Sequence, residues 1–166
     1  MSLSLIVGHI CGSRLTDLFV SGFVDPDETP VRFRPLWGLV FAEFDDRFLL
    51  EISAVERDGC CVVAGTERVR PYPDLGDDMT PAISSFAAQV FPDLDAVTRV
   101  VSVSMWAPAV REGGVRCGAL SFGLDGGQCI FFDPWHHWGL RIGDESHLRQ
   151  WEQNRPELDG SAVIFR

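Results

Sequence analysis

The sequence predicts an α+β fold that is predominantly antiparallel β-sheet, with about ten strands in meanders and hairpins and two short helices. Short apolar stretches with strand-like alternation recur along the chain, and turn sequences rich in Gly, Asp and Pro separate them. The strand–helix–strand alternation that builds a parallel sheet is not visible. With 166 residues, 46 % of them hydrophobic, and no low-complexity linker, we expect a single domain over residues 1–166.

The first half of the chain carries the clearest strands. Val31–Phe44 is rich in Val, Phe and Leu, and the turn "DDR" leads from it into Phe48–Glu56, whose alternate apolar side chains would share one face. "RDG" then leads into "CCVVAGTERV", so the three segments predict an antiparallel meander. The preceding segment, His9–Phe23, is compatible with either a helix or a strand.

A helix is predicted after the loop "RPYPDLGDD". Thr80 is a suitable N-cap, and Pro81 suits the first helical position because its missing N–H has no partner there. Pro92 would end the helix, since the residue before a proline avoids helical geometry. One apolar face with helical spacing would be formed by Ile83, Phe86, Ala87 and Val90.

The second half predicts further hairpins. Val97–Trp106 alternates, so that Val101, Val103 and Met105 are expected to face inward. "DGG" joins two apolar segments, and Asp-Gly between such segments is a strong hairpin signal. With a two-residue turn at this point, Cys129 would lie opposite Phe122.

The C-terminal region predicts a short strand, a helix and a last strand. Gly139 and Gly143 bracket the strand "LRI". Asp144 is a suitable N-cap for a helix over Glu145–Asn154, with Leu148 and Trp151 on its apolar face. "SAVIF" follows as the last strand.

The charge and the cysteines restrict the function. The net charge of −10 argues against binding to nucleic acid or to an acidic membrane surface. It fits a basic protein partner, or no partner at all if the charge only keeps the protein soluble. No apolar run reaches the roughly 18 residues of a membrane span. All 14 basic residues are Arg, which excludes Schiff-base and P-loop chemistry through Lys. The five cysteines have no C-x-x-C spacing, so we expect free thiols in a reducing cytosol.

The stretch "DPWHHW", from Asp133 to Trp138, is the main candidate site. A carboxylate and two imidazoles could ligate a transition metal, the ligand set being Asp133, His136 and His137. Adjacent residues of an extended chain point to opposite sides, so both histidines reach one ion only if the chain curls after Pro134. His147 or His9 would have to complete the site. The alternative is an aromatic corner without chemistry.

The same stretch could instead contact a protein. Exposed tryptophans beside arginine resemble the residues that dominate binding interfaces, and the candidate partner-binding residues are Trp135, His136, Trp138 and Arg141. No catalytic residue is assigned, because Cys129 lies inside a predicted strand rather than at an electropositive position that would activate its thiol.

Two functions are therefore compatible with the sequence. The first is a non-enzymatic, acidic, cytoplasmic binding protein of a bacterial type, for example an immunity- or antitoxin-like protein, that engages a basic protein through its acidic surface and the aromatic loop. It would need no cofactor. The alternative is a metal-dependent or small-ligand-binding enzyme centred on Asp133, His136 and His137.

Overall fold

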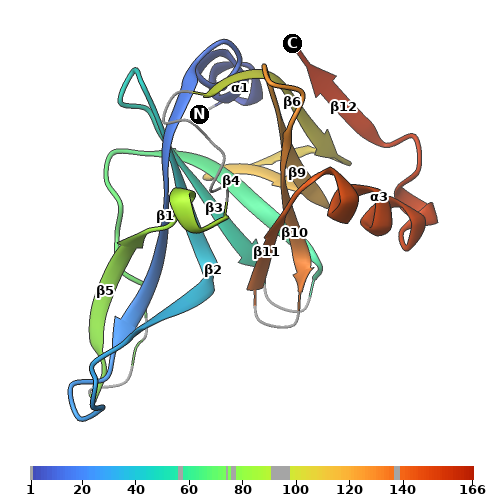
Figure 1. The fold of residues 1–166 in the computed structure, drawn as a ribbon. Helices are drawn as coiled ribbons and strands as arrows, with labels where there is room; N and C mark the ends of the chain where they lie inside the picture. The colour runs from blue at the N-terminus through green and yellow to red at the C-terminus, as the bar shows by residue number, and fades with distance from the viewer. Residues whose placement is uncertain (1, 56–57, 74, 76–77, 91–97, 137–138) are drawn as a thin grey trace.

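The computed structural model describes the chain apart from residues 1, 56–57, 74, 76–77, 91–97 and 137–138, and only the backbone of residues 89, 90, 135 and 136. The described part is mostly antiparallel sheet with short helices, as predicted (Figure 1). The strands are β1 (Arg14–Val24), β2 (Phe33–Phe44), β3 (Leu49–Val55), β4 (Cys60–Thr66), β5 (Thr80–Ser85), β6 (Thr98–Trp106), β7 (Ala109–Arg111), β8 (Gly114–Cys117), β9 (Ala119–Leu124), β10 (Cys129–His136), β11 (Gly139–Gly143) and β12 (Ala162–Phe165). The helices are α1 (Leu3–Ile10), α2 (Ala87–Val90), α3 (Glu145–Gln153) and a 3-10 turn at Pro156–Leu158.

The strands form one hydrogen-bonded order, β11-β10-β9-β6-β1-β2-β3-β4-β8-β7. The predicted meander is present as β2, β3 and β4, and the "DDR" turn joins β2 to β3 through a hydrogen bond from the Arg47 N–H to the Phe44 carbonyl. The segment His9–Phe23, which the sequence left open, is the end of α1 followed by most of β1.

The sheet divides at the junction of β1 and β6. These two strands pair only at Arg14 with Arg99 and at Leu15 with Thr98. Beyond this point β5 takes the free edge of β1, and β12 takes the free edge of β6. The two halves of the sheet diverge and then face each other, so that β11 returns to lie against β2 and β3 (Figure 1).

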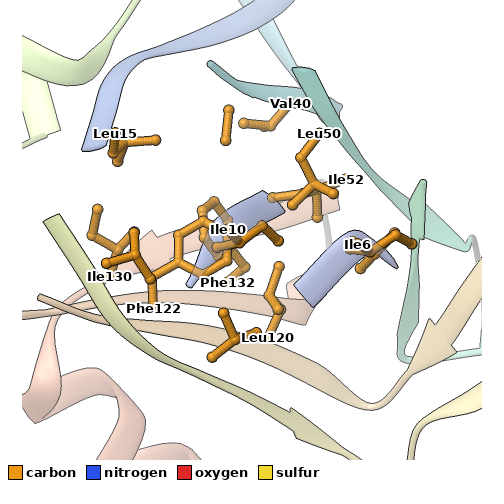
Figure 2. Packing of buried hydrophobic residues seen from close by; sticks show 14 of the residues in the cluster. Ile6, Ile10, Leu15, Val40, Leu50, Ile52, Leu120, Phe122, Ile130 and Phe132 are labelled. Atoms are coloured by element: carbon orange, nitrogen blue, oxygen red, sulfur yellow. The ribbon is translucent and has the colours of Figure 1, made fainter. Parts of the chain in front are cut away.

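The main core fills the space between the two halves. Val40, Leu50 and Ile52 from one half pack in the same cluster as Phe122 and Phe132 from the other (Figure 2). Helix α1 closes one end of this cluster, because its buried side chains are Ile6, Val7 and Ile10. Figure 2 shows Ile6 and Ile10 among the core side chains. In the described part of the chain no helix is long and apolar enough to cross a membrane.

The predicted helix at Thr80 is wrong over most of its length. Residues Thr80–Ser85 are strand β5, which pairs with β1, and within the described part of this segment only Ala87–Val90 is helical. Ile83 is 41 % exposed instead of buried. The hydrogen bonds offered by the free edge of β1 outweigh a weak helical preference, since Ser and Ile are poor helix formers. Pro81 is tolerated because β5 is an edge strand.

Two details of the predicted hairpins are also wrong. Val101 is 45 % exposed, because a β-bulge between Val100 and Ser102 turns Val100 into the core in its place. Cys129 pairs with Gly123 instead of Phe122. The "DGG" loop has three residues, closed by the Leu124 N–H on the Gln128 carbonyl, and this shifts the register by one.

Candidate functional site

Asp133, Trp135 and His136, three of the residues chosen from "DPWHHW", belong to β10, and Arg141 belongs to β11. Strand β10 runs through Pro134 to His136, with an irregularity in its register between Asp133 and His136 that accommodates the missing proline N–H. His137 and Trp138 lie outside the described residues, as do the side chains of Trp135 and His136.

Asp133 and Arg141 are the two candidate residues whose side chains the structure describes. They are direct cross-strand partners in β10 and β11. Arg141 is exposed and Asp133 is partly buried. Among the residues with described side chains, no group of three or more His, Cys, Asp and Glu could hold a metal ion. Because His136 and His137 are outside that set, the metal site predicted at Asp133, His136 and His137 stays a prediction.

Gly139 fixes where this hairpin lies. Its φ is +111°, and a Cβ built on it would stand 2.5 Å from the Trp37 carbonyl carbon and 2.6 Å from the Gly38 nitrogen. A side chain at this position would therefore collide with the backbone of β2. The absence of a Cβ lets the start of β11 cross β2 in close contact at Trp37, whose ring meets Phe86 edge to face.

A cleft of about 290 Å³ opens between helix α3 and the outer face of the β10–β11 hairpin, and Asp133 and Arg141 line it. We call it the α3 cleft. In Figure 1, α3 lies beside β10 at the side of the molecule that also carries β12. The remaining lining residues are Phe131, His147, Gln150, Trp151, Asn154 and Arg155.

One face of α3 supplies the helical side of this cleft. His147, Gln150, Trp151 and Asn154 are spaced i, i+3, i+4 and i+7, so they lie on the same face of the helix. The helix starts where predicted, at Asp144. The carboxylate of this N-cap accepts hydrogen bonds from the backbone N–H groups of Ser146 and His147.

Asp144 also holds the His147 ring. Nδ1 of His147 lies 2.9 Å from Oδ1 of Asp144 and 3.4 Å from the Asp144 backbone nitrogen. Hydrogen bonds from Ser146 and His147 lower the pKa of the Asp144 carboxyl well below its ordinary value. Gly143 allows this packing, because a Cβ there would stand 2.6 Å from Cγ of His147.

The floor of the cleft is aromatic. Trp151 is 6 % exposed and meets Trp106 and Phe131 edge to face, with ring centroids 5.3 Å and 5.6 Å apart. Trp106, Ala119, Cys129, Phe131 and Trp151 form a second apolar cluster on the outer face of the sheet. Strand β10 is thus buried on both faces, with Ile130 and Phe132 in the main core. In the described structure the buried Nε1 of Trp151 has no hydrogen-bond partner.

Hydrogen-bond donors predominate around the cleft. Arg141, His147, Gln150, Asn154 and Arg155 can all donate, whereas an ionised Asp133 can only accept. Arg155 is held at one edge by an ion pair with Glu157, with Nη1 2.9 Å from Oε1. The lining therefore suits a group that presents oxygen acceptors.

The segment that supplies the helical side of the cleft is rich in acidic side chains, none of which lines the cleft itself. The segment from Asp144 to Asp159 contains five acidic residues and two arginines. All five carboxylates are exposed, and we call them the acidic rim: Asp144, Glu145, Glu152, Glu157 and Asp159. Their field reaches the buried Cys129 thiol, whose pKa is raised first by burial and also by Glu145, Asp144 and Glu152.

Sequence reasoning identified only part of this cleft. Asp133 and Arg141 were selected, and His147 was considered only as a further metal ligand. Gln150, Asn154 and Arg155 were missed, although the i, i+3, i+4, i+7 spacing from His147 to Asn154 was available as a signal. Trp151 was assigned correctly to the apolar face of the helix.

No protein-family model, curated protein or solved structure matches this chain.

Proposed function

We propose that this chain is a non-enzymatic, acidic binding protein of the cytosol that engages a basic protein partner through α3 and the cleft beside it. The observation that carries the proposal is the acidic rim, five exposed carboxylates on and next to the helix that forms one side of a polar cleft with an aromatic floor. A field of this sign attracts basic proteins and accelerates their association. An immunity- or antitoxin-like inhibitor of a basic toxin is one concrete form of this function.

The size and lining of the cleft favour a protein ligand. Its volume of about 290 Å³ is at or below the lower limit of pockets that enclose drug-sized molecules, roughly 300 Å³. It can take one anchoring side chain of a partner. Aromatic and arginine side chains dominate the energetics of protein interfaces, and here Trp151 forms the floor and Arg141 and Arg155 lie at the edges.

The proposal is tested with charge-reversal variants. The wild-type chain is used to isolate a partner from its own cells, and the purified pair is then titrated by calorimetry at two salt concentrations. We expect Glu152→Arg to weaken binding by about tenfold and to reduce its dependence on salt. Glu112→Arg is the matched control, because Glu112 is an exposed carboxylate in the β7–β8 turn, outside α3 and the cleft.

The expected control result is an affinity within about twofold of wild type, since an isolated surface charge contributes little. Equal affinities for wild type and Glu152→Arg, or equal losses in both variants, would remove α3 from the proposal. Isolation of an acidic partner would also contradict the proposal, because the acidic rim would repel it.

The alternative is a metal-dependent or small-ligand-binding enzyme centred on Asp133, His136 and His137. One observation favours it, namely that Asp133 lines a cleft in which several donors converge. A ligand with oxygen acceptors would be held there by Arg141 and Arg155. The alternative differs from the first proposal in requiring a bound small species, which a mass measurement detects directly.

A further inference from the structure

Cys61 and Cys117 lie directly opposite each other in the antiparallel pair of β4 and β8. Their Sγ atoms are 3.5 Å apart, and both residues belong to the main core, with 0 % and 1 % of their surface exposed. Both are free thiols in this structure. Fifty-five residues separate them in the sequence, so the contact depends on the fold and not on a local motif.

The backbone geometry of this pair is suitable for a disulfide. Opposed residues in an antiparallel pair have Cα atoms about 4.5 to 5.5 Å apart, and disulfides span Cα separations of about 4.4 to 6.8 Å. The sulfur atoms therefore need only small side-chain rotations to reach bonding distance. We propose that Cys61 and Cys117 are a reversible disulfide site, oxidised by peroxide, that links the β7–β8 hairpin to β4.

The oxidation balances with one molecule of hydrogen peroxide. The Cys117 thiolate attacks one peroxide oxygen, the O–O bond breaks, and Cys117 becomes a sulfenic acid while hydroxide leaves. The Cys61 thiolate then attacks the Cys117 sulfur, the S–S bond forms, and a second hydroxide leaves. The two thiol protons convert the two hydroxides to water, so two thiols and one peroxide give one disulfide and two waters.

Access to the pair comes from the edge of the sheet. Strand β8 is the second-last strand in the order, and only the three-residue strand β7 lies beyond it. Opening of this hairpin breaks few backbone pairings and exposes Cys117. The hydrogen bond with Cys117, together with burial, raises the pKa of the Cys61 thiol well above its ordinary value, so reaction is slow at neutral pH and faster in alkali.

Cys60 is the competing thiol. It lies on the other face of β4, and Nε of Arg116 donates to its Sγ at 2.9 Å. Arg116 also pairs with Asp58. A cation beside a sulfur favours oxidation at that sulfur, so the experiment must separate Cys60 from Cys61.

Peptide mapping of a double variant makes this separation. Trypsin leaves Cys60 and Cys61 on one peptide, residues 58–68, and leaves Cys117 and Cys129 on another, residues 117–141. The variant Cys60→Ser with Cys129→Ser retains Cys11, Cys61 and Cys117. After treatment of the folded protein with hydrogen peroxide, alkylation under denaturing conditions and trypsin digestion, we expect a cross-linked peptide that joins 58–68 to 117–141.

The intact wild-type chain gives an independent readout that needs no substitution. Peroxide should leave three of its five cysteines open to alkylation, lower its mass by two hydrogen atoms, and raise the midpoint of thermal unfolding. Dithiothreitol should reverse all three changes. The proposal is overturned if all five thiols remain, if oxygen is added at Cys60 without the loss of two thiols, or if the bond joins two chains.

Discussion

At the scale of single residues, the substitution Gly139→Ala tests whether β11 packs closely on β2, because it adds one Cβ at the contact. We expect Gly139→Ala to destabilise the chain by about 3 kcal/mol, because it combines an unfavourable positive φ with a backbone collision. Urea unfolding measures the change. Gly126→Ala is the control, since a Cβ there meets nothing within 4 Å, and it should lie within about 1 kcal/mol of wild type. Similar values for the two variants would mean that the hairpin does not cross β2 as described.

Asp144 gives a pH-dependent prediction at the same scale. Its pKa is lowered by hydrogen bonds from Ser146 and His147, so its stabilising effect is full above the ordinary value of 3.8 and fades as pH falls through the folded value. We expect Asp144→Ala to cost about 1 kcal/mol at neutral pH, as loss of an N-cap does.

That cost should shrink as the pH falls below 3.8, because protonation weakens the same cap in the wild type. Urea unfolding of both proteins from neutral to acidic pH measures it. Asp159→Ala is the control, since it removes an exposed carboxylate outside the helix. A cost for Asp144→Ala that does not vary with pH would contradict the proposed role of the carboxylate.

At the scale of elements, Ile83 separates the predicted helix from the strand that is present. On the helix, Ile83 would lie on the buried face and truncation to Ala would cost about 2 to 5 kcal/mol. On β5, at 41 % exposure, Ile83→Ala should cost about 1 kcal/mol or less. Ile52→Ala, which removes a fully buried side chain of β3, calibrates the larger value in the same urea experiment. A cost for Ile83→Ala that equals the Ile52 value would favour the helix.

The two segments predicted to be helices differ in which interactions determine their structure. Helix α3 is specified locally, by the Asp144 cap and an apolar face that Trp151 buries against the outer face of the sheet. The segment after Thr80 carries comparable local signals, but the free edge of β1 lies beside it and offers a complete set of backbone partners. A pattern in the residues after Thr80 cannot reveal the free edge of β1, because β1 lies more than 55 residues earlier in the sequence.

At the scale of the whole molecule, features set by neighbouring residues could be predicted from the sequence, and features set by contacts between distant segments could not. Period-2 alternation and turn residues predicted the meander and most of the hairpins, because adjacent strands pair through short loops. Pairings between distant segments could not be predicted, and they include β6 with β12 and Cys61 with Cys117. The α3 cleft is non-local too. Asp133 and Arg141 were selectable from the hairpin alone, whereas Asn154 and Arg155 reach it only through the docking of α3.

The mass of the native protein distinguishes the two proposed functions, because only the enzyme alternative requires a bound metal or small ligand. A binding protein without a cofactor should have the mass of the chain alone when the untagged protein is purified without chelator and measured by native mass spectrometry. The enzyme alternative predicts an excess of one transition metal or one small ligand. His136→Ala should abolish a metal excess, whereas His9→Ala should retain it, because His9 is engaged by Phe48 and Asp46 of the β2–β3 connection. A metal that is lost only with His136→Ala would replace the binding-protein proposal with the metal-dependent one, since binding through α3 and its cleft requires no metal.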